Sequence, residues 1–320
     1  MYFPIAEIQI APWIPFAAGF LVAFLCSMGG VSGANLLLPF QVSVLGFTSP
    51  AVSATNHLFN IVAIPSGVYR YIKEGRMVWP LTWVVIAGTV PGVFIGVFGR
   101  IRYLPDPAHF RVFAGAVLLY IGFVMARSLI KGPPPGTDKN SSEKRFQELV
   151  RNFKKQDAAT REPLPRIQLN HFGLKTIDYT FYGENISAPT MGIFALSAIV
   201  GVIGGIYGIG GGAIIAPFFV AVFHLPVYTI AGACLMGTLI TSIVAVLFYQ
   251  FLAPFYPEMA VAPDYMLGLL MGIGGMIGMY AGARAQKFVP ANLIKWVLAF
   301  LLVFTGGRYV LSLLEIAGIW

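Results

Sequence analysis

Two long stretches without charged residues constrain this chain more than any other feature. No Asp, Glu, Lys or Arg occurs between Ile8 and Tyr69 or between Asn185 and Pro257. A helix of about 20 apolar residues crosses a hydrocarbon core of roughly 30 Å, so each stretch can hold more than one span. With 57% apolar and 11% charged residues, the chain is predicted to be an all-α polytopic membrane protein. A soluble enzyme, a nucleic-acid-binding protein and a disulfide scaffold are excluded as descriptions of the whole chain.

Each uncharged stretch is interrupted by a glycine cluster, at residues 28–35 in the first and 204–213 in the second. One ungapped alignment of the two stretches pairs Gly33 with Gly211 and then superposes a Pro-Phe dipeptide that follows both clusters. Self-similarity of this kind indicates an internal repeat. We therefore expect each half of the chain to contain a helix, a glycine break and a short second helix.

The hydropathy pattern predicts ten helical segments, five in each half. An odd number of segments in each half makes the two repeats inverted, with both chain termini on the same side. The predicted units are a first transmembrane repeat at 1–130, a linker insert at 131–187 and a second repeat at 188–320. The expected segments are 12–28, 33–46, 49–69, 79–99 and 109–129, followed by 189–206, 211–223, 226–249, 264–283 and 291–313.

Basic residues predict the orientation in the membrane. Eleven of the 21 Lys and Arg residues lie at 127–175, which places the linker in the cytoplasm by the positive-inside rule. Placing the loops 70–78 and 284–295 on the same side favours full crossing of the short segments 33–46 and 211–223 over a re-entrant course. The expected location is the inner cell membrane, and the start of the chain, without a basic region or cleavage site, predicts a retained first span.

The linker is the only part that is predicted to be soluble. Ser142–Gln156 has the pattern of a short amphipathic helix, and residues 165–185 alternate well enough for a small β-hairpin. His171 has no Cys, Asp or Glu at metal-ligand spacing. We expect a solvated cytoplasmic surface without catalytic chemistry.

Glycines also recur at every fourth position in two other predicted spans. This spacing places them on one face of each helix, where two backbones can approach closely. Close helix packing is therefore the prediction for these positions. They are Gly88, Gly92 and Gly96 in the first half and Gly274, Gly278 and Gly282 in the second.

The two glycine breaks predict an anion-binding site. Each glycine weakens a helix by about 1 kcal/mol, and the freed backbone groups need partners away from water. The helices that follow the breaks present unpaired N–H groups and a positive end, which can bind an anion. Glycine-interrupted segments at matching positions in two repeats point to a transport site, with simple helix packing as the alternative. The predicted glycines of the site are Gly30, Gly33, Gly210, Gly211 and Gly212.

Polar side chains of two neighbouring segments are predicted to line this site. Thr55, Asn56, His57 and Asn60 lie in a span without charge, where polar groups are costly and are expected to face a cavity. His57 could carry a coupled proton or remain neutral and hydrogen-bonded between helices, and both readings stay open. Thr238 is aligned with Asn60 in the repeat, although its hydroxyl could simply bond the carbonyl one turn earlier.

At these residues the sequence resembles the sulfite exporter TauE/SafE family, also called the four-toluene-sulfonate uptake permease family. The paired glycine motifs and the stretch YRYIKEGRMVW at 69–79 carry the resemblance. It implies a multi-pass inner-membrane transporter for sulfite, sulfoacetate or related organosulfonates, driven by an ion gradient. The first glycine motif departs from the family pattern, because Ser32 and Asn35 stand where glycines are usual, and these residues would add side-chain donors to the site.

The chain is therefore predicted to be a secondary transporter and not an enzyme. Its expected partners are a small oxyanion, a coupling ion such as the proton and the lipid bilayer, with no nucleic acid, metal or cofactor. The alternative is a membrane enzyme or assembly factor for a sulfur compound that uses Cys26 or Cys234 as a thiol. Only His57 could serve as the base for that chemistry, and packing is the expected role of both cysteines.

Overall fold

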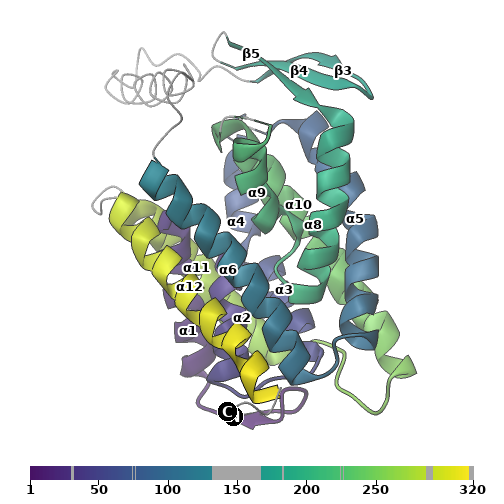
Figure 1. Ribbon diagram of the computed structural model, residues 1–320, viewed down its shortest axis with the longest axis vertical. Helices are drawn as coiled ribbons and strands as arrows, with labels where there is room; N and C mark the ends of the chain where they lie inside the picture. Colours follow the sequence, from purple (N-terminus) through teal and green to yellow (C-terminus); the bar gives the residue numbers. More distant parts are fainter. Residues whose placement is uncertain are drawn as a thin grey trace.

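The helical prediction is confirmed by a computed structural model, whose elements are shown in Figure 1. The structure describes residues 1–29, 32–73, 75, 77–131, 167–181, 184–223, 225, 227–285 and 291–316. The described helices lie side by side in one bundle, and a small sheet stands at one end. The predicted helix Ser142–Gln156 and the predicted site residue Gly30 lie outside the described residues.

The helices follow the predicted segments to within a few residues, except that 49–69 is divided in two. Pro65 begins a second helix there, since proline has no N–H to continue the first one and suits a helix start. The first half contains α1 (Trp13–Gly29), α2 (Ala34–Ser43), α3 (Ala51–Ala63), α4 (Pro65–Lys73), α5 (Trp79–Arg102) and α6 (Pro107–Lys131). The second contains α8 (Thr190–Tyr207), α9 (Gly211–Ala221), α10 (Val227–Leu252), the 3-10 turn η1 (Ala253–Phe255), α11 (Tyr265–Ala285) and α12 (Ala291–Ile316).

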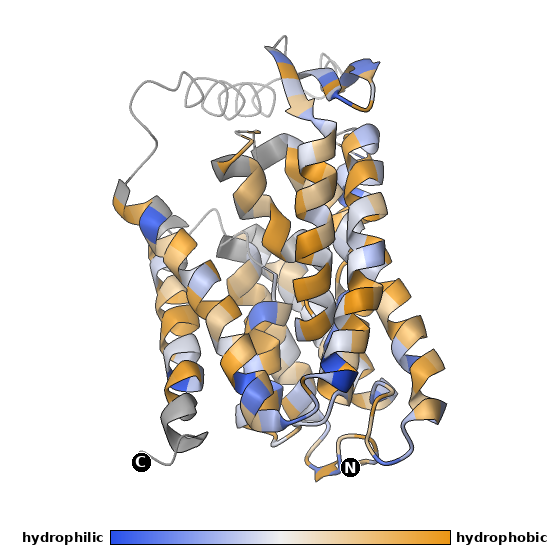
Figure 2. Cartoon of the chain, turned by 45° about the vertical axis from the view of Figure 1, so that its right-hand side comes forward, coloured by the Kyte–Doolittle hydropathy of each residue, from blue (hydrophilic) through white to orange (hydrophobic). Residues whose placement is uncertain are grey.

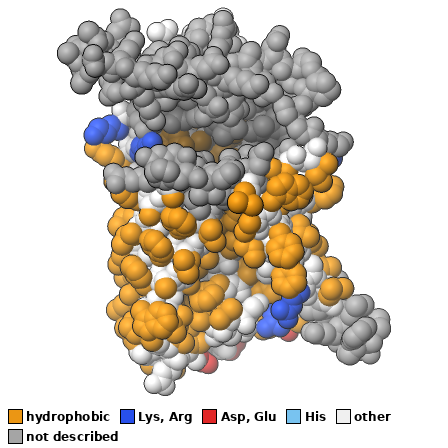
Figure 3. All heavy atoms as spheres, turned by 90° about the vertical axis from the view of Figure 1, so that its left-hand side faces the viewer, with side chains coloured by type: hydrophobic (Ala, Val, Ile, Leu, Met, Phe, Trp, Pro, Cys, Tyr) orange, Lys and Arg blue, Asp and Glu red, His pale blue; other side chains and the backbone are white. Residues whose placement is uncertain are grey.

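The side of the bundle is suited to lipid. Large apolar residues are exposed around it, among them Trp83, Phe123, Leu247 and Phe300. Among the described residues, Figure 3 shows apolar side chains over most of one face and charged side chains near its two ends. Five stretches are long and apolar enough to cross a membrane: Trp79–Arg102, Pro107–Arg127, Thr190–Tyr207, Thr229–Phe255 and Tyr265–Gly282.

The prediction that segments 33–46 and 211–223 cross the membrane is wrong. The helices formed there, α2 and α9, have 10 and 11 residues and rise by only about 15 Å. The hydroxyl group of Ser43, the last residue of α2, lies 2.6 Å from that of Tyr309 in α12. Helix α2 runs toward the end of the bundle where α1 begins (Figure 1). Likewise, α9 runs back toward the start of α8. The prediction considered only the short segment by itself as re-entrant. In the structure α1 and α2 together form the hairpin, which returns the chain to the side where α1 began, as two crossings would, so the positive-inside rule does not separate the two courses.

The basic loops lie at one end of the bundle. Helices α4, α6 and α11 end there, and α5, α8 and α12 begin there (Figure 1). The N-terminal strands β1 (Tyr2–Phe3) and β2 (Ile8–Gln9) pair at the opposite end. The basic loops therefore share one side of the bundle, as the distribution of Lys and Arg predicted.

The close packing predicted for the regularly spaced glycines is confirmed. Gly88, Gly92 and Gly96 bring α5 against α8, where an added Cβ would overlap the α8 backbone. The equivalent glycines of α11 contact α1 in the same way. The first helix of each half thus packs on a helix of the other half.

A three-stranded antiparallel sheet precedes α8. Its strands are β3 (Gln168–Phe172), β4 (Thr176–Phe181) and β5 (Glu184–Pro189), in the order β3-β4-β5. Strands β3 and β4 form a hairpin within the predicted region, and β5 adds a third strand. Figure 2 shows that the sheet is more hydrophilic than the bundle. The sheet is attached to α10, because the buried Tyr179 donates a hydrogen bond to Oγ1 of Thr229 at 2.9 Å.

Candidate functional site

Helix α3 forms the polar centre of the bundle. Thr55, Asn56, His57 and Asn60 are at most 1% exposed, although α3 belongs to a bundle whose surface is apolar. Polar groups in such a place are costly unless they are hydrogen-bonded. Their partners lie mainly on α2, on α10 and in the α8–α9 break, so α3 is the element that connects the two glycine breaks.

Amide side chains tie α3 to the first break. Nδ2 of Asn56 donates to the backbone carbonyl of Ala34, the first residue of α2, at 3.0 Å. Its Oδ1 accepts a hydrogen bond from Nε2 of Gln41 at 3.3 Å. Gln41 was not among the residues predicted from the sequence, and its signal was an amide side chain within a short apolar segment.

The start of α2 differs from its prediction. The backbone N–H of Ala34 donates to Oγ of Ser32 at 3.3 Å, and that of Asn35 donates to the Ser32 carbonyl at 3.2 Å. These two N–H groups are therefore paired locally, whereas the sequence predicted that they would be free. The side chain of Asn35 is fully buried instead, and neither Oδ1 nor Nδ2 has a hydrogen-bond partner among the described residues.

The second break is shaped by two glycines with left-handed backbone. Gly208 and Gly210 have φ angles of 91° and 74°, which residues with a Cβ rarely adopt. A Cβ on Gly208 would also meet the backbone carbonyl of Ser53 in α3 at 2.5 Å. Between the two glycines, the carbonyl of Ile209 accepts a hydrogen bond from Nδ2 of Asn60 at 3.0 Å. Helix α3 thus contacts the second break as closely as the first.

A three-residue polar cluster lies beside the second break. Oγ of Ser242 in α10 is 3.2 Å from Nδ1 of His57 and 3.4 Å from Nδ2 of Asn60. Two atoms of this cluster, Nε2 of His57 and Oδ1 of Asn60, have no partner among the described residues. We name His57, Asn60 and Ser242 the α3–α10 cluster.

Two predicted site residues have their hydroxyl groups engaged elsewhere. Thr55 donates to the carbonyl of Ala51 at 2.8 Å and accepts from the backbone N–H of Asp264 at 2.9 Å, so it anchors the loop before α11. Thr238 donates to the carbonyl of Cys234 at 2.9 Å, one turn earlier. It nevertheless lies against the second break, because a Cβ on Gly212 would meet its Oγ1 at 2.5 Å.

A tyrosine that the sequence analysis did not single out joins the two breaks. Tyr207, the last residue of α8, donates from its hydroxyl to the backbone carbonyl of Asn35 at 2.9 Å. It is completely buried. Its position inside the second glycine cluster was the available signal, since one large polar ring among glycines has room to reach another segment.

The arrangement leaves unmet hydrogen-bonding capacity around both breaks. Buried polar atoms almost always have partners, and each unsatisfied one costs about 1–3 kcal/mol. Side chains of this kind, gathered where two helices are broken, are suited to a polar ligand. Within the described part of the chain, no group of three metal-ligating side chains is present. The unpartnered atoms are Asn35 Oδ1 and Nδ2, Gln41 Oε1, His57 Nε2 and Asn60 Oδ1.

Both cysteines have the packing environment that the sequence predicted. Cys26 is buried in an apolar cluster with Leu298, and Cys234 belongs to the main apolar core. The His57 ring forms its hydrogen bond with Ser242 and not with a thiol. This geometry offers no support for the thiol-based alternative.

The sequence of this chain matches a known protein family. The family model described as "Sulfite exporter TauE/SafE" matches residues 15–309. The "Probable membrane transporter protein YdhB" of Bacillus subtilis (strain 168) is 28% identical over 114 residues, which cover 36% of this chain and 43% of that protein. The chain therefore aligns with less than half the length of this relative. No solved structure matches the chain. Because the family match includes both glycine breaks and nearly all the helices, this chain belongs to the sulfite exporter TauE/SafE family.

Proposed function

We propose that this chain is a secondary transporter that moves a small sulfur-containing oxyanion across the cytoplasmic membrane, driven by an ion gradient. Sulfite, sulfoacetate and related organosulfonates are the proposed substrates. The observation that carries the proposal is the side chain of Asn35, a fully buried amide with both polar atoms unpartnered at the first break. A ligand between the two breaks would supply the missing partners.

The chemistry of the breaks suits an oxyanion. The N-terminal ends of α2 and α9 carry partial positive charge from the helix dipole. Because the first N–H groups of α2 are paired locally, the donor offered at the first break is Nδ2 of Asn35. Arg or Lys is absent from α3 and from the described parts of both breaks. An anion held by helix dipoles and a neutral amide does not form an ion pair with a fixed counter-charge, and its release is then not slowed by breaking such a pair.

The two half-length helices suggest how access alternates. Helix α2 leads from the first break to one end of the bundle, and α9 leads from the second break to the other end (Figure 1). The hydrogen bond from Tyr207 to Asn35 holds the breaks together. In the proposed cycle, displacement of α2 opens the site to one side and displacement of α9 opens it to the other.

The proposed orientation follows the basic residues. The end that carries Lys73, Arg127 and Lys175 faces the cytoplasm, in agreement with the positive-inside rule. The strands β1 and β2 then lie on the outer side. His57 is the proposed site of coupling if the driving ion is the proton, because its ordinary pKa lies nearest to neutrality.

The test is flux through the purified protein in liposomes. Sulfite, sulfoacetate, thiosulfate and sulfate are supplied with and without an imposed proton gradient. We expect saturable flux of at least one anion, and loss of most of it in Asn35→Leu, which keeps the side-chain size but has no polar atoms. Ser197→Ala is the matched control, because Ser197 of α8 also has a buried, unpartnered hydroxyl but contacts α5. Undiminished flux in the folded Asn35→Leu protein, or no oxyanion flux at all, contradicts the proposal.

A further inference from the structure

The three-stranded sheet has one apolar face. Residues directly opposite each other in an antiparallel pair lie on the same face, and successive residues of a strand lie on opposite faces. Ile177 and Tyr179 of β4 therefore share a face, and the residues opposite them in the two neighbouring strands are apolar as well. The apolar face consists of Ile177 and Tyr179 in β4, Phe172 and Leu169 in β3, and Ala188 and Ile186 in β5.

The other face of the sheet is hydrophilic. Asn170, Thr180 and Asn185 are hydrogen-bonded to one another through their side chains. His171 lies opposite Asp178 in the register of β3 and β4. An antiparallel sheet with this division has one face packed against apolar groups and the other in water.

The bundle covers only part of the apolar face. Ile177 and Tyr179 are completely buried, and the hydrogen bond from Tyr179 to Thr229 of α10 directs this face toward the end of the bundle. On the same face, Leu169 and Phe172 of β3 are 51% and 54% exposed. The apolar face therefore continues beyond the part of the protein that covers it, and a contiguous exposed apolar surface indicates a further contact.

Hydrogen bonds fix the turn between β3 and β4 at the level of the first turn of α8. The hydroxyl of Thr190, the first residue of α8, donates to the carbonyl of Gly173 at 2.7 Å, and its backbone N–H donates to the carbonyl of Lys175 at 3.1 Å. Leu174, between these two residues, is 81% exposed. Because α8 is long and apolar enough to cross a membrane from Thr190 onward, Leu174 lies at the depth where a membrane span begins.

We infer that β3 and the β3–β4 turn rest in the headgroup layer of the bilayer, where Leu169, Phe172 and Leu174 contact lipid. The bundle end that covers the rest of the apolar face is itself surrounded by lipid, so the part that extends past the bundle meets the membrane surface. Lys175 suits this place, because a lysine at the interface keeps its ammonium group among the lipid phosphates. The polar face of the sheet then remains in water. This inference goes beyond the proposed transport function and does not rest on its substrate.

The test measures the depth of a fluorescent label in the full chain, reconstituted in liposomes of phosphatidylethanolamine and phosphatidylglycerol. Phe172→Cys and Leu174→Cys are each labelled with the environment-sensitive fluorophore NBD. The two native cysteines are buried, and the unsubstituted protein gives their background. His171→Cys is the matched control, because His171 is the exposed neighbour of Phe172 on the polar face. We expect a blue shift of the emission at 172 and 174, and loss of that emission when the lipids carry a nitroxide near the headgroup, with little of either effect at 171.

A second variant links the depth of the turn to the apolar face. In Leu174→Cys with Phe172→Glu, the carboxylate opposes insertion of β3, so the label at 174 should shift to the red and be quenched less by the nitroxide lipids. His171→Glu in the same background should change neither quantity. If substitution of Phe172 prevents folding, the label at the exposed Leu174 still decides the matter.

Two outcomes overturn the inference. One is the absence of quenching by nitroxide lipids at 172 and 174, or quenching equal to that at 171. The other is a label at 172 or 174 that is shielded from aqueous iodide but is not quenched by nitroxide lipids, which assigns the surface to a second copy of the chain. Anion flux enters none of these measurements, so failure of this inference leaves the proposed function untouched.

Discussion

The hydroxyl of Tyr207 donates a hydrogen bond to the backbone carbonyl of Asn35, and the two atoms are 2.9 Å apart. This contact joins the end of α8 to the start of α2, across 172 positions of the chain. The two glycine breaks are therefore in direct contact. A change at either break is expected to affect the other, and this coupling leads to the first prediction.

Tyr207→Phe keeps the buried ring and removes only this hydrogen bond. The free energy of unfolding should fall by about 1 kcal/mol, the typical net value of one hydrogen bond, and anion flux should fall further because the breaks separate. Thermal unfolding in detergent and liposome flux measure the two effects. Tyr265→Phe is the control, since its hydroxyl bonds Gln250 at an exposed site, and it should change neither quantity. Equal behaviour of both variants would show that the contact between the breaks has no role.

Gly211→Ala tests the close approach of α9 to α5. An added Cβ would lie 2.5 Å from Cγ2 of Thr89, so the methyl group must displace α9, at a typical cost of 1–3 kcal/mol for overpacking. Loss of most flux and a lower unfolding temperature are expected. Gly307→Ala in α12 adds the same methyl group where no atom lies within 4 Å, and it should be neutral or stabilising. Wild-type flux in Gly211→Ala would indicate that α9 is not tightly held.

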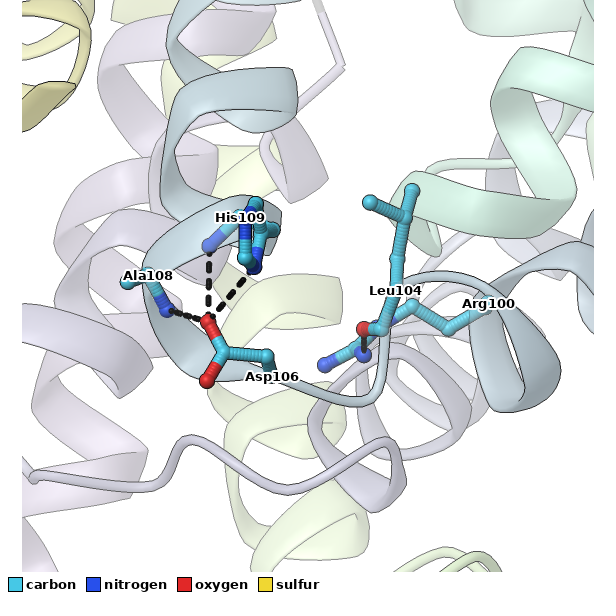
Figure 4. Close-up of polar contacts among 5 residues, drawn as sticks. All are labelled: Arg100, Leu104, Asp106, Ala108 and His109. Atoms are coloured by element: carbon cyan, nitrogen blue, oxygen red, sulfur yellow. Dashed lines mark hydrogen bonds and ion pairs between the residues drawn. The ribbon is translucent and has the colours of Figure 1, made fainter. Parts of the chain in front are cut away.

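Arg100 is a buried cation with a structural role that the sequence did not explain. Figure 4 shows its side chain turned to the Leu104 carbonyl, and it also donates to the carbonyl of Thr48 at 3.3 Å. The guanidinium lies 3.8 Å from the centroid of the Phe110 ring. It thereby links the loop before α3 to the loop before α6.

Arg100→Met keeps much of the volume and removes both hydrogen bonds. Hydrogen bonds to charged groups contribute about 1.5–3 kcal/mol each, so loss of both should lower the unfolding free energy by about 3 kcal/mol or more. Thermal unfolding measures the loss, and Arg102→Met, at an exposed position of the same turn, is the control. A shift no larger than that of the control would refute the linking role.

Tyr179 makes attachment of the sheet dependent on pH. Burial raises the pKa of Tyr179 to about 12, and the hydrogen bond with Thr229 opposes part of this rise. An unfolded tyrosine titrates near 10, so the native state holds the proton more tightly. The contribution of protonated Tyr179 to the stability of the attached sheet is therefore complete below pH about 10 and is lost as the pH rises toward about 12. Hydrogen exchange of residues 167–181 should therefore accelerate over this interval.

Tyr179→Phe is the control for that measurement. In this variant, hydrogen exchange in the sheet should be faster at neutral pH, because the hydrogen bond to Thr229 is lost. Between pH about 10 and about 12, its exchange rate should rise only as ordinary base catalysis requires, because no group at this position ionises. A step that persists in Tyr179→Phe would assign it to another group.

Local sequence properties predicted a large part of the fold. The length of apolar segments depends only on the thickness of the membrane core, so the helices were found to within a few residues. The glycines of α5 and α11 were correctly assigned to packing, because four-residue spacing places them on one helix face in any context. The breaks were also located correctly, since Gly208 and Gly210 interrupt a helix wherever the chain places them.

The partners within the site came only from the tertiary structure. His57 and Asn60 were recognised as costly polar residues, but their contacts to Ser242 and Ile209 depend on how α3, α10 and the second break meet. Thr55 was assigned to the site as a polar residue in the same uncharged span, although its hydroxyl anchors the loop before α11. Adjacent residues on a helix point in different directions, so neighbours in sequence need not share a site.

The sequence by itself determined that this chain is a helical membrane protein with two matching breaks, because hydrophobic length and glycine content act locally. Only the tertiary structure decided that α2 and α9 turn back instead of crossing, and that Tyr207 closes the gap to Asn35. Both are contacts between segments far apart in the chain. Their free energies depend on packing in three dimensions, which no local pattern of residues encodes.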